Sequence, residues 1–133
     1  MIYFCADDYG ISAESNNRIE NCLKNGALNK VSVLPNGDIK NFKKRLLEND
    51  AVLSLHINLV EGSPLSKAED IKMLLSDNGY FKYSFPGLFL LSFSPKRKEL
   101  ERQIYKEIQS QIKFWKTAVG DDAPVWLDSH QHT

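Results

Sequence analysis

The chain has 133 residues, and its 17 Lys and Arg balance its 17 Asp and Glu, so the formal net charge at pH 7 is +0. Hydrophobic residues make up 42% and charged residues 26%, which is typical of a folded domain and argues against a disordered chain. The neutral balance gives no support to a nucleic acid partner. The sequence contains no apolar run of the roughly 20 residues that span a bilayer, and its first residues lack the basic segment of a signal peptide. We therefore expect a cytoplasmic protein without a membrane span.

Strands and helices alternate in the pattern of the first sixty residues. Short β-prone runs predict strands at residues 2–6, 28–34 and 51–60. Ser12 has the character of a helix N-cap and Asn25 begins a helix stop, so the first helix is expected between them. Amphipathic spacing predicts a second helix over 39–49. This order is typical of βαβ units and predicts an α/β fold with a parallel sheet.

In the second half of the chain, the sequence pattern assigns the elements before the long helix less clearly than the helix itself. Residues 69–76 predict a short helix, and the aromatic segment 80–93, which a Pro-Gly pair interrupts, fits either a flap over a site or a buried excursion. Ser94 is expected to cap a helix that has proline at its first position and ends at Gly120. A fourth strand is expected at 124–128. The predicted apolar face of the long helix consists of Leu100, Ile104, Ile108, Ile112, Trp115 and Val119.

The two cysteines, Cys5 and Cys22, lie within apolar patterns rather than in a paired framework. This placement predicts reduced thiols packed in the core. A disulfide between them is not expected.

Polar side chains gather where the expected parallel strands end. In parallel α/β folds, ligands bind beyond the carboxyl ends of the strands. Side chains alternate along a strand, so Ser54, His56 and Asn58 share one face of the third strand, and such a polar stripe points to a cavity or a wet site. The polar residues at the strand ends are Asp7 and Asp8, His56 and Asn58, and Asp128, His130 and His132.

One carboxylate and two imidazoles would form a three-ligand site for a divalent cation, with positions left for water and substrate. A second carboxylate beside it could take a proton from water that the cation acidifies, so the set predicts metal-assisted hydrolysis. Each residue also has an ordinary explanation. The Asp7-Asp8 pair could form an Asx turn or face a helix dipole, His56 could be a hydrogen-bonded core histidine, and Asn58 could organise a loop.

Three segments of the chain, taken together, resemble the YdjC-like carbohydrate deacetylases. They are ADDYGIS at 6–12, LHINLVEGSPL at 55–65 and LDSHQH at 127–132. The resemblance runs through the whole chain in order. It implies a (β/α)-barrel-like deacetylase fold in which residues 1–133 form the N-terminal portion, because chains of that family are considerably longer.

The resemblance implies a metal-dependent hydrolase that removes an acetyl group from an N-acetylated carbohydrate. The cation would be Mg²⁺ by resemblance, although two imidazoles and a carboxylate suit Zn²⁺ or Mn²⁺ at least as well. Carried over by position, the resemblance implies that Asp7 is the catalytic base and that Asn58 and His132 contact the substrate. It implies that the metal ligands are Asp8, His56 and His130.

Two other functions fit the same residues. A metal-dependent phosphoesterase or amidohydrolase would use similar ligands, but no Lys or Arg closely flanks the motifs to hold a phosphate. A catalytically inactive sugar- or metal-binding module is the second alternative. A half barrel would also leave open sheet edges, so we expect either a missing C-terminal half or a homo-oligomer, and low activity of the chain by itself.

Overall fold

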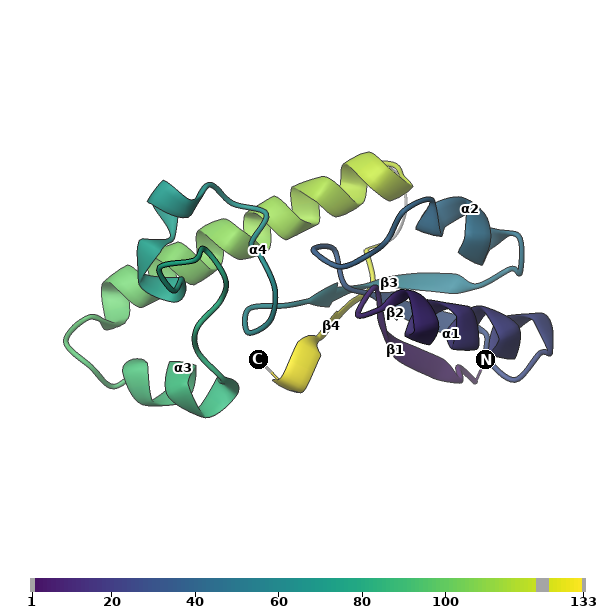
Figure 1. The fold of residues 1–133 in the computed structure, drawn as a ribbon, viewed down its shortest axis with the longest axis horizontal. Coiled ribbons are helices and arrows are strands. Elements are labelled where there is room, and N and C mark those ends of the chain that lie inside the picture. Colours follow the sequence, from purple (N-terminus) through teal and green to yellow (C-terminus); the bar gives the residue numbers. More distant parts are fainter. Residues whose placement is uncertain (1, 122–124, 133) are drawn as a thin grey trace.

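The computed structural model describes residues 2–121 and 125–132, except for the side chain of His132, and contains a small sheet flanked by helices (Figure 1). The strands are β1 (Cys5–Tyr9), β2 (Lys30–Val33), β3 (Val52–Ile57) and β4 (Leu127–Ser129). The α-helices are α1 (Ala13–Lys24), α2 (Phe42–Leu47), α3 (Phe85–Leu91) and α4 (Arg97–Val119). Three short 3-10 helices are η1 (Ala68–Asp70), η2 (Lys72–Leu74) and η3 (His130–His132).

The sheet is parallel throughout and its strands lie in the order β1-β2-β3-β4. This confirms the predicted α/β fold with alternating strands and helices. Because all four strands run the same way, their carboxyl ends lie at one edge of the sheet, where sites form in such folds. The register sets Ser32 beside Ser54 and His56 beside Asp128, which places these four polar residues on neighbouring strands.

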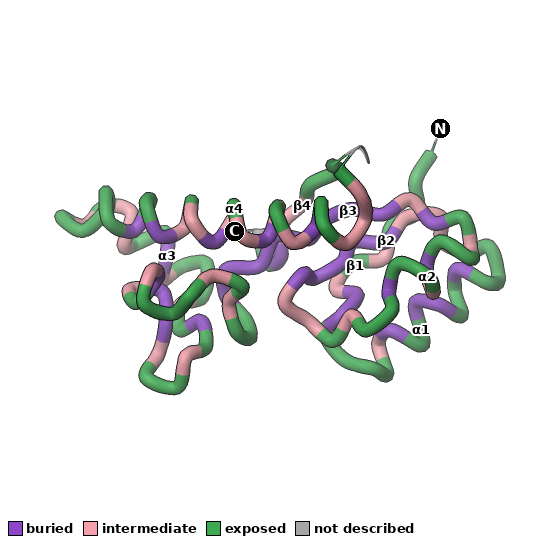
Figure 2. Tube along the Cα trace, turned by 90° about the horizontal axis from the view of Figure 1, so that it is seen from above, coloured by how far each residue is buried: buried purple, intermediate pink, exposed green. Residues whose placement is uncertain are grey.

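Helices α1 and α4 pack against the sheet, and α2 packs beside them. Helix α1 contacts β1 and α2, and α4 contacts β3. The ring of Phe42 on α2 stacks on Trp115 of α4, with the ring centroids 5.8 Å apart. Along β3, Leu53 and Leu55 belong to this core, while the alternating residues point to the opposite face. Buried positions run through the strands and along one side of α4 (Figure 2).

Helix α4 is long enough to extend past the sheet, and the connecting segment with η1, η2 and α3 packs near its first half (Figure 1). The predicted apolar face of α4 is only partly correct. Two of its residues, Leu100 and Trp115, are buried and the others are partly buried, but the most deeply buried residues between these two are polar: Gln103, Glu107 and Gln111. These side chains bind backbone groups of the connecting segment, which an apolar face could not satisfy.

Several expected boundaries were wrong. Strand β1 begins and ends three residues later than expected, so Asp7 and Asp8 lie inside it and not beyond it. Helix α4 begins after Lys96 rather than at the predicted Ser94 cap, whose Oγ accepts a hydrogen bond from the Lys96 N–H instead. The Ser12 cap is confirmed, because Ser12 Oγ accepts from the Ser15 N–H at 3.1 Å.

Other elements also differ from expectation. The helix expected at 69–76 is two 3-10 turns, and the ambiguous segment 80–93 contains α3, which has proline in its first turn. The cysteines are free, but both are exposed and do not lie in the core. Residue 124, the expected start of the fourth strand, lies outside the described residues. Among the described residues, none of the helices has the length and apolar character needed to cross a membrane.

Candidate metal centre

The end of β1 is irregular, and this irregularity decides where its two aspartates lie. The pairing with β2 shifts register between Ala6 and Tyr9, and Asp8 has a φ of 64°, in the left-handed region. Regular alternation would send adjacent side chains to opposite faces. The shift lets Asp8 turn toward the carboxyl ends of β3 and β4.

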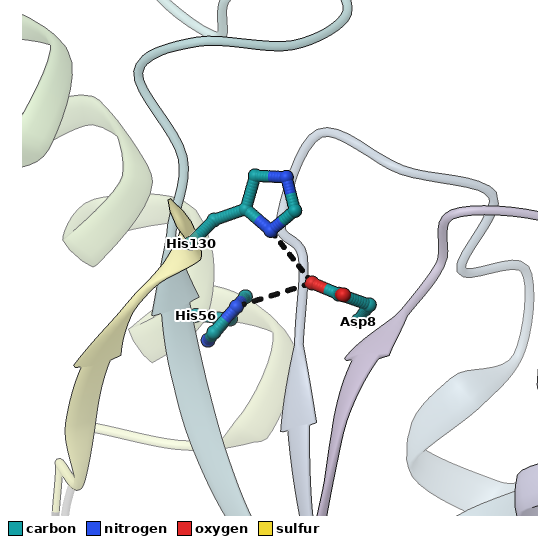
Figure 3. Close-up of side chains that lie close together, drawn as sticks. All are labelled: Asp8, His56 and His130. Atoms are coloured by element: carbon teal, nitrogen blue, oxygen red, sulfur yellow. Dashed lines mark hydrogen bonds and ion pairs between the residues drawn. The ribbon is translucent and has the colours of Figure 1, made fainter. Parts of the chain in front are cut away.

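Asp8 meets two histidines there (Figure 3). Asp8 Oδ1 lies 2.6 Å from His130 Nδ1 and 3.2 Å from His56 Nε2. Both imidazoles are buried, with relative exposures of 5% for His56 and 4% for His130. The structure therefore brings together, from β1, β3 and the turn after β4, the three residues that the sequence analysis selected as a ligand set.

The geometry of this trio fits a divalent cation. One ligand atom from each of the three residues lies within 4.8 Å of the others. Ligands at about 2.1 Å from a tetrahedral cation are about 3.4 Å apart, so small side-chain rotations would be enough to admit one. The two imidazole nitrogens and one carboxylate oxygen are also a donor set that first-row divalent metals accept.

Asp128, to which the sequence analysis gave no role, lies behind His56. Its Oδ1 is 2.7 Å from His56 Nδ1, the ring nitrogen that faces away from Asp8. Its Oδ2 accepts hydrogen bonds from Ser54 Oγ at 3.0 Å and from Ser32 Oγ. Lys30 Nζ lies 3.8 Å from the same oxygen. The polar alternation of Ser54 and His56 along β3 was visible in the sequence, but the register that sets Asp128 beside His56 comes from the structure.

The electrostatics of the His56–Asp128 pair favour a charged Asp128 carboxylate. Burial raises the pKa of Asp128, but hydrogen bonds from His56, Ser32 and Ser54 lower it by more, so the net direction is downward. Burial lowers the pKa of His56, and the hydrogen bond and charge of Asp128, followed by the charges of Asp8 and Asp7, raise it overall. Asp128 is thus an acceptor at neutral pH.

The predicted catalytic base, Asp7, lies beside this network and not within the trio. Cys5 Sγ donates to its Oδ1 at 3.4 Å. Ligand atoms of Cys5, Asp7 and Asp128 lie within 4.8 Å of one another, forming a second group of possible ligands. This group is the poorer cation site, because Asp128 is engaged by His56 and because partial burial and Asp7 raise the pKa of Cys5 to about 11. Metal ligation requires the thiolate.

Asn58 organises the loop after β3. Its Oδ1 accepts from the N–H groups of Val60 and Glu61, and its Nδ2 donates to Asn36 Oδ1 and to the Glu61 carbonyl. Both amide hydrogens and both acceptor positions are therefore used. This geometry favours the loop-organising role over the predicted substrate contact. The side chain of His132, the other predicted substrate contact, lies outside the described residues.

The same loop carries Glu61 to the edge of the trio. Glu61 Oε2 lies 3.4 Å from His130 Nε2, and its Oε1 accepts from Gln131 Nε2 at 2.6 Å. Beside it, a cavity of about 260 Å³ opens among the loops that follow β1, β2 and β3, with Asn36, Asp38 and Glu61 in its wall.

A parallel α/β sheet that gathers one carboxylate and two imidazoles at its carboxyl edge defines the class: an α/β protein with a candidate metal centre. The family follows from comparison with known proteins. The family model described as YdjC-like protein matches residues 1–133, so the chain belongs to the YdjC-like family.

Curated relatives bear this out. A carbohydrate deacetylase of Thermoanaerobacter pseudethanolicus is 32% identical over 130 residues, which cover 96% of this chain and 48% of the relative. A carbohydrate deacetylase of Homo sapiens is 29% identical, over 96% of this chain and 39% of the relative. The chain thus spans about half or less of the length of these relatives.

A solved structure has the same fold. It is an Enterococcus faecalis V583 protein named for cellobiose-phosphate cleavage, with a TM-score of 0.72 at 20% identity. The match covers 97% of this chain and 48% of that chain. At this identity the likeness concerns the fold alone.

Proposed function

We propose that this chain carries the metal centre of a metal-dependent hydrolase that removes an acetyl group from an N-acetylated carbohydrate. The observation that carries the proposal is the convergence of Asp8, His56 and His130 at the carboxyl edge of the sheet. Membership of the YdjC-like family and the naming of its relatives as carbohydrate deacetylases support it. The proposal concerns the part of the site that these residues form.

A divalent cation at the trio would polarise the acetamide carbonyl and acidify a water molecule. Asp8 supplies a negative charge to the site, and His56 and His130 supply neutral ring nitrogens. Asp7 is proposed as the base that takes the proton of the attacking water onto a carboxylate oxygen. The Cys5 contact leaves that carboxylate with free acceptor positions for a second donor.

The choice of cation is left to experiment, because the likeness to the family favours Mg²⁺ and the imidazole-rich donor set favours Zn²⁺, Mn²⁺ or Co²⁺. Titration of the apo-chain with each metal, followed by calorimetry, measures this directly. We expect one ion per chain, and loss of binding in His56→Gln and His130→Gln. Asp70→Asn, which removes an aspartate paired with Lys106 on the surface, is the matched control and keeps full affinity. Equal affinity in all four proteins would refute the metal centre.

Hydrolysis is tested in a chain of full length. The aligned part of this chain would replace the matching segment of the Thermoanaerobacter relative, with which it shares 32% identity over 130 residues. We expect the chimera to release acetate from N-acetylated chitooligosaccharides when the cation is present, and to lose this activity with His56→Gln. We expect the 133-residue chain to release little acetate by itself. A chimera as active with His56→Gln as without it would contradict the proposal.

The same chimera separates the alternatives. Asp7→Asn should keep the bound cation and lose acetate release if Asp7 is the base, whereas a binding module has no turnover to lose. Hydrolysis of a phosphate ester in place of the acetamide would favour a phosphoesterase. The geometry gives that alternative no advantage, because Lys30 is engaged by Asp128 and lies over the ring of Trp126.

Homo-oligomer formation and a cytoplasmic location stay predictions. Light scattering of the purified chain and fractionation of the cells that produce it would test them.

A further inference from the structure

We propose that Asp128 is a positioning residue that keeps the proton of His56 on Nδ1 and thereby turns the lone pair of Nε2 toward the cation. The inference rests on the proposed function, since it assigns a role to a residue behind the metal centre. Asp128 does not touch the trio's central position. It would act through the ring of His56.

The two nitrogens of His56 have different neighbours. Nδ1 lies 2.7 Å from Asp128 Oδ1, and Nε2 lies 3.2 Å from Asp8 Oδ1. A neutral imidazole has one N–H and one lone pair. An ionised carboxylate can only accept. Asp128 is the nearer carboxylate to the His56 ring, and Asp8 Oδ1 lies closer to His130 Nδ1, at 2.6 Å, so Asp128 holds the N–H on Nδ1 and leaves the lone pair at Nε2, as cation binding requires.

Asp128 is itself held by groups that can donate to its other oxygen. Ser54 Oγ lies 3.0 Å from Oδ2, Ser32 Oγ contacts the same atom, and Lys30 Nζ lies 3.8 Å away. Both serines are completely buried in the middle of β2 and β3. Packing does not explain why serine occupies these two buried positions, because alanine would fill the same space. Hydrogen bonds from the two hydroxyls to a carboxylate do explain it. The carboxylate therefore cannot rotate freely away from His56.

This arrangement makes Asp128→Asn an informative substitution of the same shape. The carboxamide oxygen should take the Oδ2 position, because the Lys30 ammonium can donate but cannot accept. The NH₂ group then faces His56 Nδ1. Nδ1 must accept, the ring proton moves to Nε2, and the lone pair no longer faces the cation. The same substitution in the Ser-His-Asp triad acts through the wrong tautomer.

The tautomer can be read by NMR without any metal. Two-bond ¹H–¹⁵N spectra of the labelled chain would be recorded at a pH where His56 is neutral, with its signals assigned by their loss in His56→Gln. We expect the Nδ1–H form in the wild-type chain and in Asp70→Asn, and the Nε2–H form in Asp128→Asn. If Asp128→Asn fails to fold, the wild-type spectrum decides. Asp128→Ala is a second variant, and it should give a mixture of tautomers.

The second measurement is the affinity of the chain for Co²⁺. The absorption spectrum of the bound Co²⁺ reports the ligand geometry. We expect Asp128→Asn to bind Co²⁺ about 10- to 100-fold more weakly than the wild-type chain, and Asp70→Asn to bind it equally well. Two results would overturn the inference. One is a wild-type His56 with its proton on Nε2. The other is an Asp128→Asn variant with the same His56 tautomer and the same Co²⁺ affinity as the wild-type chain. If the wild-type chain takes up no Co²⁺ but the tautomer changes as expected, the proposed function fails and the role of Asp128 in setting the tautomer stands.

Discussion

Replacement of Glu107 by methionine should destabilise the fold strongly, although Glu107 lies away from the metal centre. Glu107 is completely buried on α4, and its carboxylate accepts from the N–H groups of Leu65 and Ser66 at 3.0 and 2.9 Å and from Gln111 Nε2 at 2.9 Å. Methionine has a similar volume and accepts none of these bonds. The substitution therefore removes the polar contacts and leaves the packing nearly unchanged.

The magnitude follows from the three bonds. A hydrogen bond to a charged group contributes about 1.5–3 kcal/mol. The loss is smaller here, because the 65–66 segment is partly exposed and can regain water, and because the desolvation cost of the carboxylate disappears with it. We expect a loss of about 2–4 kcal/mol in the free energy of unfolding, a large part of the 5–15 kcal/mol that is usual for a domain.

Urea unfolding followed by circular dichroism measures this loss, and amide hydrogen exchange at Leu65 and Ser66 should become faster. The matched control is Glu101→Met on the exposed side of the same helix, where Glu101 pairs with Arg97. That change should have little effect. If Glu107→Met unfolds at the same urea concentration as Glu101→Met, the buried carboxylate does not hold the loop and the reasoning is wrong.

Three further predictions concern the loops and the edge of the site. Asn58→Ala should lower the urea midpoint, because four hydrogen bonds of its amide are lost; a weaker affinity for N-acetylated chitooligosaccharides with no loss of stability would instead favour the substrate contact. Gly37→Ala should prevent or severely weaken folding, since the added Cβ would lie 2.4 Å from the Gly10 carbonyl oxygen. Gly79→Ala, where the Cβ meets open space at a φ of +81°, should cost only about 1–2 kcal/mol of backbone strain, and thermal unfolding compares the two variants. The Cys5 thiol should react slowly with iodoacetamide at neutral pH, because partial burial and the hydrogen bond and charge of Asp7 raise its pKa to about 11. Asp7→Asn lowers that pKa and should speed alkylation of Cys5, as measured by peptide mass spectrometry; an unchanged rate would show that Asp7 does not control the thiol.

The sequence was enough to predict the alternation of strands and helices, and from it the parallel sheet. Apolar periodicity is a local property, so it can be recognised without knowing which elements pack against each other. The wider set of polar residues was also predictable, because parallel strands bring their carboxyl ends to one edge regardless of how far apart they lie along the chain. The likeness to the YdjC-like family then selected Asp8, His56 and His130 from that set, and the structure brings these three together.

The tertiary structure decided the details that depend on contacts between distant segments. The register shift in β1 turns Asp8 toward His56, and a propensity pattern carries no trace of it. The predicted apolar face of α4 left out the buried polar residues, because only the folded chain sets Glu107 and Gln111 against backbone groups that need partners. Asp128 likewise acquires its role from its neighbour across β3 and β4, since a hydrogen bond depends on distance in space and not on separation in sequence.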